Sequence, residues 1–121
     1  MNKKSIIDQA KLISEMMLEK KAVNIKIIDV RDITTLTDIF IICTSNSNPQ
    51  TKAISDNINQ KMKTHGLTPW HIEGYETLDW VLIDYVNIVI HIFNSDTRDY
   101  YNLENLWADG KITLIEDSYE T

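Results

Sequence analysis

Residues 80–107 read WVLIDYVNIVIHIFNSDTRDYYNLENLW and hold the densest pattern in the chain. Two apolar runs, residues 80–83 and 88–93, are separated by a polar break, which is typical of a β-hairpin. Leu82 and Asp84 share one strand face with the opening tryptophan, because side chains alternate between faces with a period of two. A carboxylate at that position needs a donor or water. The stretch therefore predicts two strands of one sheet, with aromatic and acidic side chains on the same face.

The segment that follows the second run predicts an amphipathic helix. Leu103, Leu106 and Trp107 fall on one helical face, and Arg98 and Tyr101 lead into it. We expect Phe93, Leu103 and Trp107 to belong to the core.

The patterns upstream predict a helix, two strands, a second helix and a third strand. These elements are a helix capped by Ser5, strands over residues 23–30 and 38–44, a helix capped by Asn48 and ended at Gly66, and a strand over residues 67–73. The element order α-β-β-α-β-β-β-α predicts an α/β fold, a mixed five-stranded sheet flanked by helices. We expect one domain over residues 1–121, with residues 115–121 as a frayed tail.

Composition favours a protein partner over a nucleic acid. The chain has 12 basic and 18 acidic side chains and a formal net charge of -6. Its basic residues cluster no further than the pairs at residues 3–4 and 20–21, which disfavours direct contact with a phosphate backbone. An acidic domain can still bind a basic protein, because opposite potentials steer association.

The single cysteine, Cys43, lies in an apolar run and is expected to be a buried, inert thiol in a reducing compartment. The N-terminal residues lack the apolar region of a secretory signal, and no apolar run approaches the ~20 residues of a membrane span. We therefore expect a soluble cytoplasmic protein.

Two histidines could carry chemistry. His71 and Glu73 share a strand face and could be metal ligands, but a third ligand is not evident, so we expect no metal or other cofactor there. His91 lies between isoleucines in an apolar strand, where a histidine is more often a hydrogen-bonded structural residue than a catalyst.

Asp29, Asp38 and Asp84 stand at predicted strand ends, where acids could act as general bases or hold two metal ions. The chain has no phosphate-binding glycine loop and no GxSxG motif. Enzyme chemistry is therefore the weaker interpretation.

Several of these segments together resemble the ribosomal silencing factor family, also called Iojap-like proteins. The shared features are a tryptophan strand ending in Asp84-Tyr85, a strand ending in His91-x-Phe93, the string Arg98-x-x-Tyr101-x-Leu103-Glu104-x-Leu106-Trp107, and upstream residues 29–31, 36–44, 50–53 and 73–74. The resemblance covers residues 5–109. Two positions depart from the family pattern: Val86-Asn87 replaces the usual Gly-Asp, and Ile39 replaces a usual tyrosine.

The resemblance implies a fold like that of nucleotidyltransferase domains, although the paired acids of those enzymes are missing. It also implies a function: binding the large ribosomal subunit through its protein fourteen, blocking the small subunit, and repressing translation when nutrients are short. It makes eight residues candidates for partner binding: Glu73, Trp80, Asp84, Tyr85 and His91 as partner-facing, with Arg98, Tyr101 and Glu104 supporting or bordering them. Two alternatives remain open at this point, a nucleotidyltransferase-like enzyme and a small dimeric scaffold, and the family resemblance also allows a homodimer.

Overall fold

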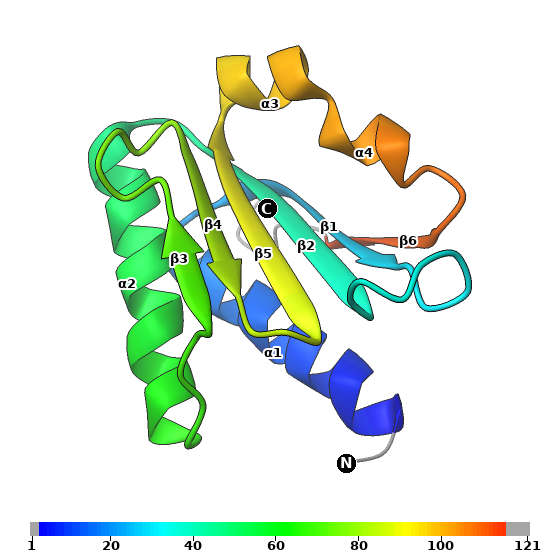
Figure 1. Cartoon of the computed structure of the whole chain (residues 1–121). Helices are drawn as coiled ribbons and strands as arrows, with labels where there is room; N and C mark the ends of the chain where they lie inside the picture. The colour runs from blue at the N-terminus through cyan, green and yellow to red at the C-terminus, as the bar shows by residue number, and fades with distance from the viewer. Residues whose placement is uncertain (1–2, 116–121) are drawn as a thin grey trace.

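A computed structural model of the chain describes residues 3–115, with the side chains of residues 6–115. These residues form one mixed sheet between two layers of helices (Figure 1). The elements are α1 (Lys3–Glu19), β1 (Val23–Asp29), β2 (Ile39–Ser45), α2 (Asn48–Thr64), β3 (His71–Glu73), β4 (Trp80–Asp84), β5 (Ile88–Asn94), α3 (Ser95–Tyr101), α4 (Leu103–Leu106) and β6 (Lys111–Ile115). The strand order is β3-β4-β5-β2-β1-β6. The predicted mixed α/β architecture is confirmed, but the strand count is six and not five.

The strands at the centre of the sheet are buried on both faces. All seven residues of β2 are buried, and β2 runs parallel to β5 from Ile39 opposite Ile88 to Ser45 opposite Asn94. A short apolar strand of this kind is typical of a position covered on both sides. The other neighbouring pairs are antiparallel.

α1 and α2 cover one face of the sheet (Figure 1). Ala10, Ile13 and Met17 of α1 are fully buried, as are Ile54 and Ile58 of α2. Their spacing of three or four residues puts them on one side of each helix, where they meet the isoleucines of the sheet. This layer holds the larger of the two cores.

Both helix starts differ from the prediction. α1 begins at Lys3, so Ser5 lies within the helix and is not its N-cap. Ser47, and not Asn48, caps α2, because Ser47 has extended backbone and its hydroxyl accepts the N–H of the residue three positions on. The end of α2 is as predicted, since Gly66 follows it with a left-handed φ of 79°.

α3 and α4 lie on the opposite face, over a smaller core. Phe93 is fully buried there, and Leu103 and Trp107 pack against it, as predicted. The prediction of a single helix in this segment is wrong, because Asn102 has a left-handed φ of 47° and separates α3 from α4. Leu106, which the pattern assigned to the same apolar face as Leu103 and Trp107, is 72% exposed, so that part of the prediction is wrong.

β6 is the strand that the sequence pattern missed. It pairs with the edge of β1, with Lys111 opposite Asp29 and Ile115 opposite Ile25. Four of its five residues are exposed, so it lacks the burial that makes a strand recognisable. Ile115 therefore belongs to a strand and not to a frayed tail, and the rest of the predicted tail lies outside the described residues.

β3 is at the opposite edge of the sheet and is limited to residues 71–73. The N–H of Leu67 donates to the carbonyl of Met62 in α2, so the chain is still closing the helix at that point. Pro69 cannot donate to a strand ladder. The predicted strand over residues 67–73 is therefore too long.

Candidate protein-binding face

Half of the sheet face on the α3 side carries a continuous set of side chains from three strands. Residues directly opposite in a register point to the same face, and the registers of β3, β4 and β5 join these positions. The set, called the open face below, consists of His71, Glu73, Trp80, Leu82, Asp84, Val89 and His91. α3 packs mainly on β5 and β2, whereas β4 and β3 lie further toward the edge of the sheet (Figure 1). The period-two pattern of β4 thus brings together four of the predicted residues, Glu73, Trp80, Asp84 and His91.

The centre of the open face is a tryptophan held by a histidine. Trp80 Nε1–H donates to His91 Nδ1 at 3.0 Å. His91 is only 4% exposed, and this burial lowers its pKa to about 4. The imidazole is therefore neutral at pH 7, with its hydrogen on Nε2, which has no hydrogen-bond partner among residues 6–115. His91 supports Trp80 from below and contributes little surface itself.

Aromatic rings continue from Trp80 across the sheet. The Trp80 ring lies 4.8 Å from that of Phe93 and 4.9 Å from that of Tyr101, centroid to centroid. Tyr101 ends α3 and is 53% exposed. The two neighbouring rings fix the tryptophan and leave a half-exposed aromatic surface at the border of α3.

The edge of the open face is acidic. Glu73 is exposed, and its Oε1 lies 3.0 Å from His71 Nε2. Asp84 Oδ1 accepts the N–H of Val86 at 2.7 Å, which supplies the donor that the sequence pattern required. An apolar centre with a charged rim is the usual composition of a protein-binding surface.

Tyr85 does not join this face. Its hydroxyl donates to Asn59 Oδ1 of α2 at 3.0 Å, and its ring packs against the core between the helices and the sheet. Burial raises the pKa of the Tyr85 hydroxyl to about 12. The side chain therefore ties the hairpin to α2 on the other side of the sheet.

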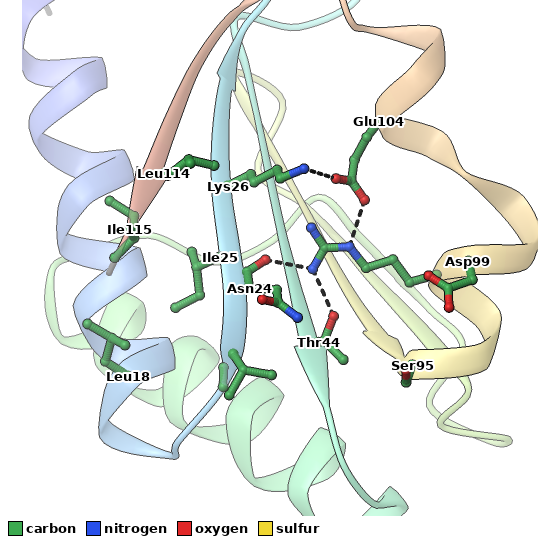
Figure 2. A pocket seen from close by; sticks show the side chains of 13 residues that line it. Leu18, Asn24, Ile25, Lys26, Thr44, Ser95, Asp99, Glu104, Leu114 and Ile115 are labelled. Atoms are coloured by element: carbon green, nitrogen blue, oxygen red, sulfur yellow. Dashed lines mark hydrogen bonds and ion pairs between the residues drawn. The ribbon is translucent and has the colours of Figure 1, made fainter. Parts of the chain in front are cut away.

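Arg98 and Glu104 also lie apart from the open face, in a cleft under α3 and α4 (Figure 2). Arg98 is 8% exposed; its Nη1 donates to the carbonyl of Asn24 at 2.6 Å and to Thr44 Oγ1 at 2.8 Å, and its Nε donates to Glu104 Oε1 at 2.7 Å. Lys26 pairs with the second carboxylate oxygen. The arginine thus joins both short helices to β1 and β2.

These contacts perturb the glutamate. The hydrogen bond from Arg98, followed by that from Lys26, holds the pKa of Glu104 at about 2, against the opposing effect of burial. The cleft has a volume of about 810 Å³, and its walls are polar toward Ser95 and Asp99 and apolar toward Leu114 and Ile115 (Figure 2). Arg98 and Glu104 position the elements beside Tyr101 and present little surface to a partner.

The sequence analysis missed several residues around these sites. Val89, which lies opposite Asp84 in the sheet, belongs to the open face but was not predicted; Leu82 was assigned to the correct face by the two-residue period but was not named as a candidate for binding. Asn24 and Lys26 hold Arg98 and Glu104 across more than 70 positions of sequence, and no local signal identifies them.

The aspartates considered for catalysis do not form a metal-binding group in the described part of the chain. Asp29 binds Arg31 through both carboxylate oxygens, and this hydrogen bonding keeps the pKa of Asp29 below its ordinary value. Asp84 is used by the turn at Val86. Within residues 3–115 no three His, Cys, Asp or Glu side chains form a group that could hold a metal ion. The two-metal arrangement considered for these acids is therefore not assembled in this part of the chain.

Cys43 is fully buried, as predicted, and burial raises its pKa to about 12. In the part of the chain that the structure describes, every helix is too short or too polar to cross a membrane.

Comparison with known proteins gives a consistent result. A family model described as "Ribosomal silencing factor during starvation" matches residues 3–120. A protein of Bacillus subtilis named "Ribosomal silencing factor RsfS" is 37% identical over 116 residues, covering 96% of each chain, and one of the same name from Halalkalibacterium halodurans is 38% identical over 98 residues, covering 81% of this chain and 84% of the relative. A crystal structure of a Chromobacterium violaceum protein superposes with a TM-score of 0.82 at 31% identity, covering 98% of each chain.

Proposed function

Since this chain belongs to the ribosomal silencing factor family, we propose that it binds the large ribosomal subunit through ribosomal protein fourteen and prevents the small subunit from joining. Translation is thereby repressed when nutrients are limiting, and the site of action is the cytoplasm. The match over residues 3–120 and the name shared by relatives of similar length support this proposal.

The structural observation that carries the proposal is the open face. Trp80, which is partly buried, and Tyr101, which is 53% exposed, supply an aromatic centre, and Glu73 and Asp84 border it with negative charge. Aromatic side chains are enriched at the energetic centre of protein interfaces, and complementary charge at the rim steers a basic partner into place. The face therefore fits a basic ribosomal protein.

The eight candidate residues divide into three roles within this proposal. Glu73, Trp80, Asp84 and Tyr101 contact the partner. His91, Arg98 and Glu104 hold those residues in position from beneath, through the bonds to Trp80 and to the α3–α4 segment. Tyr85 fastens the hairpin to α2 and makes no contact with the partner.

The proposed mechanism is steric and regulatory and needs no chemical step. A domain of this size that occupies a surface used by the small subunit excludes that subunit as long as it stays bound. Inhibition should therefore follow occupancy of the large subunit. It should also weaken with salt, because the acidic rim contributes through screened charges.

The test is sedimentation of the purified protein with isolated large subunits, isolated small subunits and joined ribosomes over a salt series. We expect selective, salt-sensitive association with free large subunits and reduced subunit joining. Trp80→Ala should abolish association, and Glu73→Lys should weaken it at low salt without disturbing the fold, because Glu73 is exposed. Leu114→Ala is the matched control, since Leu114 is a 65% exposed apolar residue on β6 at the far edge of the sheet. A folded protein that associates with no ribosomal particle would refute the proposal.

A further inference from the structure

Three exposed apolar side chains, called the apolar rim below, lie on segments that are hydrogen-bonded to one another at the end of the sheet where the β4–β5 turn lies. Leu36 is 78% exposed, Trp70 is 75% exposed and Val86 is 57% exposed. Hydrogen bonds hold their segments together: Trp70 N–H donates to the carbonyl of Asp84 at 2.8 Å, and Thr37 Oγ1 donates to the carbonyl of Val86 at 2.9 Å. The apolar rim thus combines residues from the loop before β2, from the residue just before β3 and from the β4–β5 turn.

The backbone of Val86 is unusual for a valine. Its φ is 75°, in the left-handed region that β-branched residues rarely adopt. The N–H of Asn87 donates to the carbonyl of Tyr85 at 2.9 Å, so Val86 is the central residue of a γ-turn, a strained arrangement when φ is positive. Glycine would adopt this turn without steric cost.

The strain is held in place by contacts on both sides of the residue. Asp84 Oδ1 accepts the N–H of Val86, and Thr37 holds its carbonyl. The side chain itself is more than half exposed, so its burial within the chain does little to offset the strain. Strain that the surroundings fix in this way is a feature of binding sites. The turn therefore presents a rigid apolar side chain to solvent.

We propose that the apolar rim extends the open face and that Val86 inserts into an apolar depression on the same basic protein that the open face binds. This rests on the proposed function. The argument for this proposal is that the apolar rim and the open face are continuous through Asp84. This residue belongs to the open face, its side chain accepts the N–H of Val86, and its backbone carbonyl accepts the N–H of Trp70. A partner lying on the acidic and aromatic face therefore reaches Val86 without a gap, and the valine is a specificity-determining contact of this chain.

The proposal predicts opposite effects of one substitution on stability and on binding. Val86→Gly removes the strained side chain, so the midpoint of thermal unfolding should rise. The same change should weaken association with isolated large subunits about fivefold to tenfold, the size expected for loss of one buried valine at an interface. Leu36→Ser, which changes no strained backbone, should weaken association without raising the midpoint. Leu114→Ala on β6 is the control and should change neither affinity nor midpoint.

Wild-type protein must bind large subunits for the test to apply, so failure of the wild type refutes the proposed function itself. If the wild type binds and Val86→Gly binds equally well, the inference about Val86 is overturned while the proposed function stands. A fall in the midpoint of Val86→Gly would also overturn the inference, because the valine would then serve its own fold. Sedimentation of the free protein tests whether a second copy of the chain binds the apolar rim instead. If Val86→Gly dissociates a dimer but leaves ribosome binding intact, the apolar rim is a self-association surface and the proposal is wrong.

Discussion

Replacing Glu104 by glutamine should make the protein less stable at neutral pH and less sensitive to acid. Glu104 bonds Arg98 and Lys26, and its pKa falls from 4.5 to about 2 in the folded protein. A group whose pKa is lowered by folding contributes stability above its unfolded pKa and loses that contribution as the pH falls through its folded pKa. Stability from Glu104 is therefore complete near pH 7 and is lost between about pH 5 and pH 2.

The magnitude follows from the shift. One pKa unit corresponds to about 1.4 kcal/mol, so the shift of Glu104 is worth roughly 3 kcal/mol at pH 7. The amide oxygen of Glu104→Gln can still accept from Arg98, which leaves an expected loss of roughly 2–3 kcal/mol at pH 7. At pH 3 the wild-type carboxylate has lost more than half of its contribution, so the two proteins should differ by only about 1 kcal/mol.

Urea unfolding of both proteins at pH 7, 5, 4 and 3 measures this difference directly. Other carboxylates with lowered pKa values, such as Asp29 and Asp56, titrate in both proteins and cancel in the comparison. Glu76→Gln, at an exposed glutamate, is the control and should lie within about 0.5 kcal/mol of wild type at pH 7. A loss for Glu104→Gln that stays constant from pH 7 to pH 3, or that is below about 0.5 kcal/mol at pH 7, would refute the role assigned to the Arg98–Glu104–Lys26 contacts.

Three other predictions concern the sheet. Gly74→Ala should destabilise the fold by about 3 kcal/mol or more in thermal unfolding, because Gly74 has a φ of 90° and an added Cβ would clash with the carbonyl oxygen of Trp80. An unchanged unfolding midpoint would contradict this geometry. Trp80→Phe should cost about 1–2 kcal/mol in urea unfolding at pH 7, since it leaves the buried Nδ1 of His91 without its donor while the contact with Phe93 can persist. Cys43 should react with a thiol reagent at pH 8 only after addition of denaturant, because it is fully buried with a pKa of about 12; rapid reaction of the native protein would show that β2 opens.

Much of the sheet was predictable because its strands are apolar runs with clear ends. β2, β4 and β5 lie within one or two residues of their predicted positions. The same two-residue period assigned Trp80 and Asp84 to one face correctly. Applied one residue further, it puts Tyr85 on the opposite face, so the separation of Tyr85 from the open face was also within reach of the sequence.

The contacts of Arg98 were not predictable in the same way. Its acceptors include a backbone carbonyl at Asn24, which has a φ of 52° where the register between β1 and β2 shifts. A carbonyl carries no residue-specific signal, and it lies 74 positions away along the chain. β6 was not predicted for a related reason: four of its five residues are exposed and the fifth is only partly buried, so this edge strand shows no periodicity in its sequence.

The position of β6 also bears on how the chain folds as it is made. Asp29 of β1 lies opposite Lys111 of β6, a residue that is synthesised 82 positions later, so one edge of β1 stays unpaired until β6 has been made. During that interval β1 offers a bare isoleucine-rich edge, which is the kind of template on which unfinished chains aggregate. A nascent chain should therefore complete its sheet late, and shielding of β1 by chaperones should matter most before residues 111–115 emerge.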